Sequence, residues 1–352
     1  MQRRTLTLIH ATRPVATVAR SVCRSLLGRT RSFVADNKLP LIVFLWYFIN
    51  VVFNIKNKAL YNYFPCPAFV SALHLAVGSL WGIVGWLAFP KGNAVFPQRQ
   101  IMPRKLLLGR NFQLQAMFHG LGHTAVNFSF GAVAVSFTHT VKAMEPFVAA
   151  AISQLVFRKK VALPVWLSLV PVVAGVALAS AHELSFNWVG FNGAMFSNVA
   201  FAFRNYLAKE GLSKELNSTN QYIHLSIVSL LWCIPPIFML EATKLWPAMQ
   251  AAAASHGTIP FLGDLFFVGL TYHLYNQLCF NAIEAFDKPL TASVGNVAKR
   301  CFVIGFSILY FGNAITPQTA AGTIIAIAGV FLYSMSSARE KQKRAAAEAK
   351  AA

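Results

Sequence analysis

The sequence predicts an all-α membrane protein, and three observations lead to this fold class. Of its 352 residues 56% are hydrophobic and only 12% are charged, about half the charged fraction of a typical soluble domain. Apolar runs of roughly twenty residues, the length that a helix needs to cross a bilayer, recur along the chain. The connections between these runs are short, so that consecutive helices should lie antiparallel. A soluble domain is therefore excluded.

Ten apolar spans follow one another from residue 39 onward. Small residues within them, such as Gly78, Gly175, Gly305 and Gly329, allow neighbouring helices to approach closely. The predicted spans are 39–59, 66–89, 107–130, 132–157, 161–181, 186–208, 220–242, 260–284, 289–311 and 316–337.

The first 36 residues form a separate, basic segment. Seven arginines precede the first acid, Asp36, and serine and threonine recur among them. This composition is typical of an organellar transit peptide, and a basic tail on the positive side of the membrane is the alternative. At the other end, residues 339–352 form a basic, alanine-rich tail.

The connections predict how the spans are oriented. Four alternate connections carry the cations, whereas the opposite ones have none except Lys244. Because basic loops stay on the positive side of a membrane, an even number of spans places both termini on that side, facing the stroma or cytosol. The cations of these connections are Lys91, Arg99, Arg104 and Lys105, then Arg158, Lys159 and Lys160, then Lys209 and Lys214, and finally Lys288.

The chain also contains an internal repeat. The fifth span contains AGVALAS and the tenth contains AGVFLYS, and a deep lysine precedes each: Lys142 lies 33 residues before Gly175, and Lys299 lies 30 residues before Gly329. Five spans is an odd number, so the two halves, 37–182 and 183–338, should have opposite orientations. Inverted repeats are typical of secondary transporters, whose site lies near the midplane between the halves.

Cations inside the spans are the strongest functional signal. A charge at the centre of a membrane helix costs at least ~2.5–3.5 kcal/mol, so it should face a cavity or a partner. Snorkelling toward the membrane surface is a plausible alternative for Arg204 and Lys58. The candidates are Lys142, Arg204, Lys299 and Arg300, with Lys56 and Lys58 nearer the end of the first span.

These deep cations outnumber the deep acids. Glu145 lies three residues after Lys142, shares its helix face and is its local partner. We expect no acid beside Lys299 and Arg300. A cluster of lysine and arginine that is not neutralised requires an anion, and two or three such groups suit a dianionic phosphate. Tyr275 and Asn276 in the eighth span could contact the uncharged part of such a ligand.

Other chemistries have little support. The cations that give the net charge of +20 lie at the termini, in connections and at a few deep positions. We therefore expect no nucleic-acid partner. His119 and His123 have the i, i+4 spacing of two metal ligands, but no acid lies nearby to complete a site. No motif of hydrolysis, nucleotide binding or metal catalysis occurs, so we expect neither an enzyme nor a cofactor.

Two stretches, AVSFTHTVKAMEP (134–146) and VGNVAKRCFVIGFSI (294–308), carry a specific resemblance. They are similar to the plastidic phosphate translocator family of the drug/metabolite transporter superfamily, and the similarity extends from residue 39 to 338. GHTAVNFSF (122–130) is most similar to the triose-phosphate subgroup. The resemblance implies ten helices in two inverted five-helix repeats, and strict exchange of a phosphorylated metabolite for inorganic phosphate across the inner plastid envelope.

The resemblance also implies roles for particular residues. Lys142, Lys299 and Arg300 would hold the phosphate, and His123, Arg204 and Tyr275 would contact the rest of the substrate. Val126 falls where some members have a polar residue, with Thr124 two positions away. The further candidates around this site are Thr124, Thr138, Glu145, Lys56, Lys58 and Asn276.

Several alternatives remain open at this point. The substrate could be triose phosphate, 3-phosphoglycerate, phosphoenolpyruvate or a sugar phosphate. A nucleotide-sugar antiporter of an endomembrane would instead exchange its substrate for a nucleoside monophosphate. The third alternative is a membrane receptor or a structural protein that transports no solute. The paired deep cations in repeat-related spans disfavour this alternative. The sequence leaves the oligomeric state open.

Overall fold

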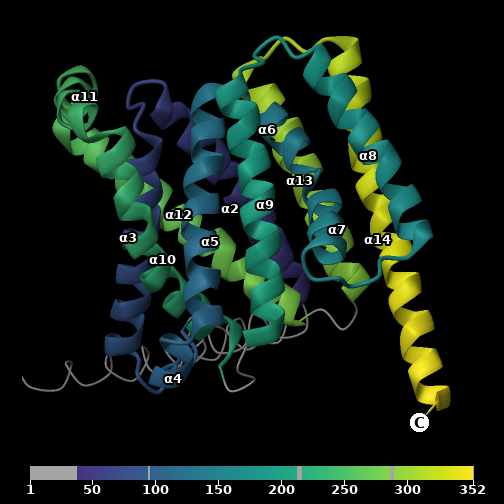
Figure 1. The fold of residues 1–352 in the computed structure, drawn as a ribbon. Helices are drawn as coiled ribbons and strands as arrows, with labels where there is room; N and C mark the ends of the chain where they lie inside the picture. The colour runs from purple at the N-terminus through teal and green to yellow at the C-terminus, as the bar shows by residue number, and fades with distance from the viewer. Residues whose placement is uncertain (1–37, 94–95, 212–215, 286–288, 352) are drawn as a thin grey trace, which may run out of the picture.

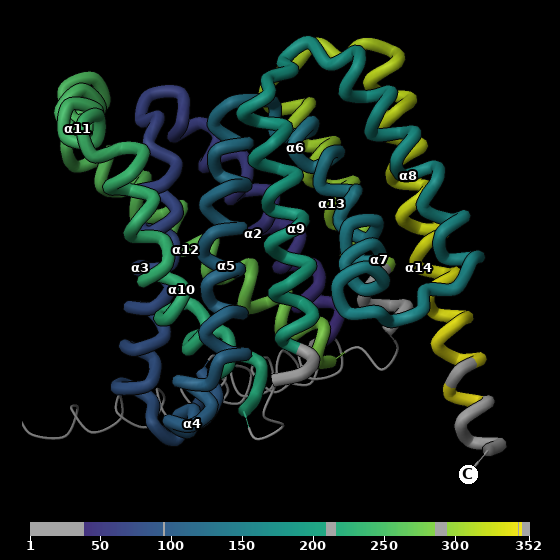
Figure 2. The backbone as a smooth tube through the Cα atoms, viewed as in Figure 1, coloured from purple at the N-terminus to yellow at the C-terminus, as the bar shows by residue number. Residues whose placement is uncertain are grey.

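The computed structural model describes residues 38–93, 96–211, 216–285 and 289–351, and every regular element in this part of the chain is an α-helix. Most of the long helices run side by side in one bundle (Figures 1 and 2). The helices are α2 (Lys38–Tyr61), α3 (Pro67–Ala88), α4 (Arg104–Leu107), α5 (Arg110–Ala132), α6 (Val135–Lys142), α7 (Glu145–Leu155), α8 (Leu163–Ala181), α9 (Trp188–Gly211), α10 (Ser218–Leu240), α11 (Ala242–His256), α12 (Thr258–Ala285), α13 (Pro289–Phe311) and α14 (Pro317–Ala351).

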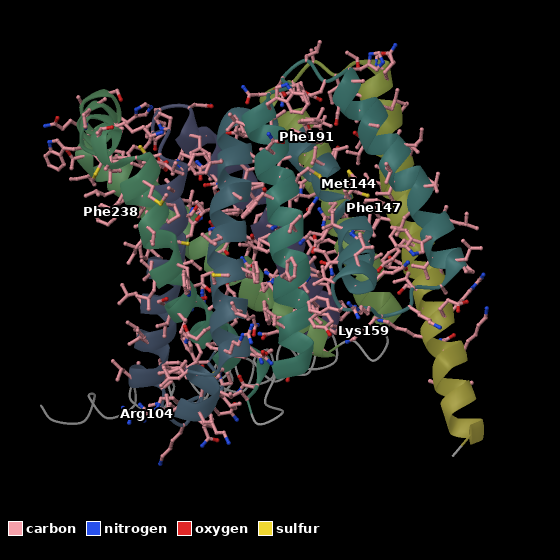
Figure 3. The ribbon with its side chains drawn as sticks, viewed as in Figure 1. Arg104, Met144, Phe147, Lys159, Phe191 and Phe238 are labelled. Carbon is pink, nitrogen blue, oxygen red and sulfur yellow. The ribbon has the colours of Figure 1, made fainter. Side chains whose placement is uncertain are left out.

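Helices occupy all ten predicted segments, which confirms the all-helical fold class. The predicted segment 1–36, Lys214 and Lys288 lie outside the described residues. Arg104 and the α7–α8 connection with Lys159 lie at the same end of the bundle, toward which the C-terminus of α14 also extends (Figure 3). This common end is what the positive-inside rule requires of basic connections.

Three features of the fold differ from the predicted spans. The segment 132–157 is two short helices, α6 and α7, because Pro146 at the start of α7 has no N–H to continue the helical ladder. The short helices α4 and α11 were not predicted, since neither is long enough to be detected as a span. The predicted tail 339–352 is continuous with the last predicted span, because α14 runs as one helix to Ala351.

Within the described residues, six helices are long and apolar enough to cross a membrane: α2, α3, α8, α10, α13 and α14. Three others, α5, α9 and α12, reach at least 23 residues but carry too many polar groups to qualify by composition. On α5 these groups form a buried stripe at intervals of four residues: Gln115, His119, His123 and Asn127. Residues spaced in this way share one helix face, so α5 directs polar side chains toward the interior of the bundle.

A buried carboxylate fixes the start of α3. Glu241 is fully buried between α10 and α11, and its two oxygens accept hydrogen bonds from the backbone N–H groups of Ala68 and Phe69, both at 2.9 Å. The first N–H groups of a helix have no partner within it, and a negative charge there is stabilising. Glu241 therefore connects the end of α10 to α3.

Close backbone contact joins α8 to α14 at one edge of the bundle (Figure 1). A methyl group added to Gly175 would lie 2.4 Å from the backbone nitrogen of Ala326, and one added to Gly329 would lie 2.7 Å from that of Val172. The two AGVxLxS segments therefore face each other, and their glycines allow the two backbones to touch.

This contact generates a prediction for Gly175→Ala. The added methyl group meets backbone rather than a flexible side chain, so the helices must separate, and overpacking of this kind costs about 1–3 kcal/mol. We expect a lower unfolding temperature in detergent. Gly305→Ala is the matched control, because a methyl group at Gly305 has no neighbour within 4 Å. Equal unfolding temperatures for the two variants would contradict the contact.

Candidate functional site

Four cations from three helices converge in the interior. Lys142 ends α6, Arg204 lies on α9, and Lys299 and Arg300 lie side by side on α13; α6 packs against both α9 and α13. Lys142 interacts electrostatically with the other three. The structure thus brings together the four residues that the sequence predicts as deep cations.

Lys142 is 9% exposed, and its surroundings are built by α9. Its Nζ donates a hydrogen bond to Ser197 Oγ at 3.1 Å and lies 4.6 Å from the centre of the Phe201 ring. The guanidinium carbon of Arg204 lies 4.5 Å from the same ring. Ser197, Phe201 and Arg204 are spaced i, i+4, i+7, which places them on one helix face.

Sequence reasoning missed both Ser197 and Phe201. Neither is charged, and only their spacing from Arg204 indicated that they share its face. An aromatic ring that contacts two cations offers its negative π face to both, which lowers the cost of holding them close without removing their charge.

Glu145 forms a salt bridge with Arg300 and also interacts electrostatically with Lys142, its predicted partner. The two residues between Lys142 and Glu145 both keep right-handed helical φ and ψ angles, so Glu145 still follows Lys142 by about one turn. Arg300 Nη2 donates a hydrogen bond to Glu145 Oε2 at 2.8 Å. The expectation that no acid lies beside Lys299 and Arg300 is therefore wrong, because an acid 155 residues away in sequence reaches Arg300.

The cluster keeps an excess of positive charge. Among the described residues that interact electrostatically with Lys142, three are cations and one, Glu145, is an acid. The side chain of Arg300 is only 15% exposed and that of Glu145 is 23% exposed. Including Lys142 itself, four cations share one carboxylate in a place where water is scarce.

Two aromatic residues of α2 contact α13 at and near Lys299. Its Nζ lies 5.3 Å from the centre of the Trp46 ring, and Trp46 is fully buried. The neighbouring Tyr47 donates a hydrogen bond from its hydroxyl to the Gly295 carbonyl oxygen at 2.6 Å, one turn before Lys299. These two contacts fix α13 against α2 and hold the lysine on the interior face.

His123 and Tyr275 flank the cations from α5 and α12. His123 interacts electrostatically with Lys142, its Nε2 lies 3.1 Å from His74 Nδ1, and its ring lies 4.1 Å from that of Tyr272. One of the two facing histidine nitrogens must carry a proton and the other a lone pair. Tyr275 is half-buried, and its ring lies 5.1 Å from that of Phe53.

The lesser candidates have local partners. Thr124 Oγ1 donates to the Gly120 carbonyl oxygen at 3.0 Å, and Asn276 Nδ2 donates to that of Tyr272 at 2.9 Å. The hydroxyl of Thr138 shares a 2.8 Å hydrogen bond with that of Ser129, which joins α6 to α5. Thr124 and Asn276 thus each bond to a carbonyl oxygen of their own helix, and Thr138 joins two helices.

The two histidines with metal-like spacing have separate partners. His119 Nδ1 accepts a hydrogen bond from Arg204 at 3.1 Å, whereas His123 faces His74. Within the part of the chain that the structure describes, no group of three or more histidine, cysteine, aspartate or glutamate side chains is placed to hold a metal ion.

Lys56 and Lys58 do not join the cation cluster. Lys56 is exposed, and Lys58 donates to the carbonyl oxygens of Phe130 at 2.8 Å and Val133 at 3.0 Å. These carbonyls lie at the end of α5 (Arg110–Ala132), where the last C=O groups have no helical partner and a positive charge is stabilising. Lys58 thus has a structural role.

This role predicts the effect of Lys58→Met. The substitution keeps the length of the side chain but leaves the carbonyls without a donor, which costs about 1–3 kcal/mol. We expect a lower unfolding temperature and an unchanged affinity for anions. Lys56→Met, two residues away on the same helix, is the control and should unfold as the unsubstituted protein does. A loss of anion affinity in Lys58→Met alone would refute the structural assignment.

A profile of the Triose-phosphate Transporter family matches residues 37–334. The chloroplastic triose phosphate/phosphate translocator of Flaveria pringlei is 47% identical over 357 residues, covering 96% of this chain and 85% of the relative. That of Spinacia oleracea is 50% identical over 303 residues, covering 86% and 72%.

A relative with a different substrate in its name is less similar. The chloroplastic xylulose 5-phosphate/phosphate translocator of Arabidopsis thaliana is 40% identical over 310 residues, covering 87% of this chain and 72% of the relative.

Proposed function

The chain belongs to the Triose-phosphate Transporter family, and from this premise we propose that it exchanges inorganic phosphate for phosphorylated three-carbon metabolites across the inner plastid envelope. Triose phosphate and 3-phosphoglycerate are the proposed organic substrates. The family match confirms the resemblance drawn from the sequence. The higher identity to triose phosphate translocators than to the xylulose 5-phosphate translocator supports a three-carbon substrate.

One observation carries the proposal: Lys142 on α6 meets Lys299 and Arg300 on α13 in an interior where, among the residues that the structure describes, four cations share a single carboxylate. Such a site attracts a small, doubly charged anion. Arg300 offers a planar fork that suits two phosphate oxygens, and the two lysines add point charges. We assign the phosphate group to these three residues.

We assign the rest of the substrate to Arg204, His123 and Tyr275. Arg204 contacts His119 and Phe201 at the edge of the cluster, so its guanidinium can reach a second negative group such as a carboxylate. His123 and Tyr275 provide a ring nitrogen and a phenol within an aromatic wall. A polar hydroxyl or carbonyl group of a short substrate could bind there.

The proposed architecture has ten membrane-spanning segments in two inverted repeats, 37–182 and 183–338, with the pair α6–α7 counted as one segment. In this arrangement Lys142 belongs to the first repeat, and Lys299 and Arg300 belong to the second. Both termini would face the stroma, and residues 1–36 would act as a transit peptide. The gathering of basic connections at one end of the bundle supports this orientation.

The charge excess also suggests why exchange should be obligatory. An occluded intermediate without an anion would hold mutually repelling cations away from water, which is costly in a medium of low dielectric constant. A bound phosphate would neutralise the cations and bridge the two repeats. The site should therefore change its exposure from one side of the membrane to the other only when it is loaded.

We predict that Lys299→Ala and Arg300→Ala each weaken phosphate binding at least ~30-fold, because removing one partner of a desolvated charge pair costs about 2–5 kcal/mol. Reconstituted vesicles that contain unlabelled phosphate would be used to measure uptake of labelled phosphate over a range of concentrations. Lys56→Ala, an exposed cation outside the cluster, is the control and should exchange at the rate of the unsubstituted protein. Exchange at that rate by Arg300→Ala would refute the assignment of the site.

Obligatory exchange generates a separate prediction. Vesicles loaded with phosphate, dihydroxyacetone phosphate or 3-phosphoglycerate should take up labelled phosphate, and empty vesicles should take up almost none. Loading with phosphoenolpyruvate, glucose 6-phosphate or a nucleotide tests selectivity in the same assay. Equal uptake by empty and loaded vesicles would contradict the mechanism, whereas uptake driven only by an internal nucleoside monophosphate would indicate a nucleotide-sugar antiporter.

A further inference from the structure

An apolar groove opens between α7 and α8, away from the cation cluster. It encloses about 480 Å³. Its lining comes from hydrophobic side chains of the two helices, among them Phe147, Trp166, Leu167, Val170, Val173 and Ala174. Phe147 and its surroundings lie between α7 and the α8–α14 pair in Figure 3. A volume of this size and character suits a hydrocarbon chain.

The groove lies where lipid surrounds the protein. Leu163, Leu167 and Val170 on the adjacent surface of α8 are 69%, 61% and 60% exposed, as expected of side chains that face acyl chains. From Trp166 to Ala174 the lining runs about 12 Å along α8 at 1.5 Å per residue. This length matches a substantial part of an extended acyl chain.

Three consecutive cations lie at one end of the groove. Arg158, Lys159 and Lys160 lie in the connection between α7 and α8 and are all exposed. Trp166, the first lining residue on α8, follows this connection by one turn of helix. Lys159 Nζ lies 4.3 Å from the Tyr206 ring, which holds it beside α9.

We propose that the groove binds one acyl chain of an anionic phospholipid whose phosphate lies against the basic connection that carries Arg158. Cations at a membrane surface attract anionic lipids by about 1 kcal/mol each, and the groove below them accepts the chain that hangs from the same head group. A second copy of this protein fits less well, because a two-fold contact would bring two basic connections together.

The bound lipid would also support the transport site, a consequence that rests on the proposed function. α7 is only 11 residues long and begins at Glu145, which pairs with Arg300. A lipid chain between α7 and α8 would fill the space behind α7 and limit its movement relative to the cluster. Binding itself can be measured without any transport.

The experiment measures lipid retained by the purified full chain. The protein in detergent is mixed with equal amounts of phosphatidylglycerol and phosphatidylcholine that have identical acyl chains, and the bound lipids are counted by native mass spectrometry. We expect phosphatidylglycerol to be retained at least tenfold over phosphatidylcholine. Ala174→Phe, which fills the groove from an exposed position, should reduce the retention of both lipids.

Arg158 allows the head-group half of the proposal to be tested without harming the fold. Its φ of 51° lies in the left-handed region, which glycine adopts more readily than arginine does. Arg158→Gly should therefore unfold no earlier than the unsubstituted protein and should retain about fivefold less phosphatidylglycerol, with phosphatidylcholine unchanged. Arg158→Lys should restore the retention.

Two control variants complete the set. Leu309→Phe alters an exposed apolar residue of α13, and Lys341→Gln removes an exposed cation of α14; neither should change lipid retention. Equal retention of the two lipids, or normal retention by Ala174→Phe, would overturn the proposal. A response to Ala174→Phe without one to Arg158→Gly would overturn the anionic head group, and conversion of a dimer to a monomer by Ala174→Phe would assign the groove to a second copy.

Discussion

Positive charge that is not neutralised inside an apolar bundle is the constraint on which the rest of this structure depends. Each deep cation is costly in a membrane interior, and the fold lowers that cost without cancelling the charge. Phe201 contacts both Lys142 and Arg204, Trp46 lies beside Lys299, and Glu145 pairs with Arg300. Aromatic faces and one carboxylate hold the cations in place and leave an excess that an anion can neutralise.

The same constraint explains which helices are polar. α5, α9 and α12 fail the composition expected of lipid-exposed spans, and they supply His123, Phe201, Arg204 and Tyr275 to the site. The apolar helices α8 and α14 instead pack closely through glycines. α13 combines both characters, because it is apolar enough to cross a membrane and also carries Lys299 and Arg300.

The break between α6 and α7 connects these two parts of the molecule. Lys142 ends one short helix and Glu145 begins the next, so adjacent turns direct a cation toward Ser197 and an acid toward Arg300. Glu145 therefore interacts with both cations, with Lys142 electrostatically and with Arg300 through a salt bridge. The proposed lipid groove lies on the other face of α7, so the helix that carries Glu145 lies between the two binding regions.

The sequence by itself determined the all-helical class, the positions of ten apolar segments and the identity of the deep cations, because hydrophobic length and the cost of charge are local properties of a chain. Only the tertiary structure decided the partners. Glu145 reaches Arg300 across 155 residues, Lys58 caps α5, and Ser197 and Phe201 surround Lys142. Such contacts depend on how helices pack, and the polar residues that make them have no distinctive pattern along the chain.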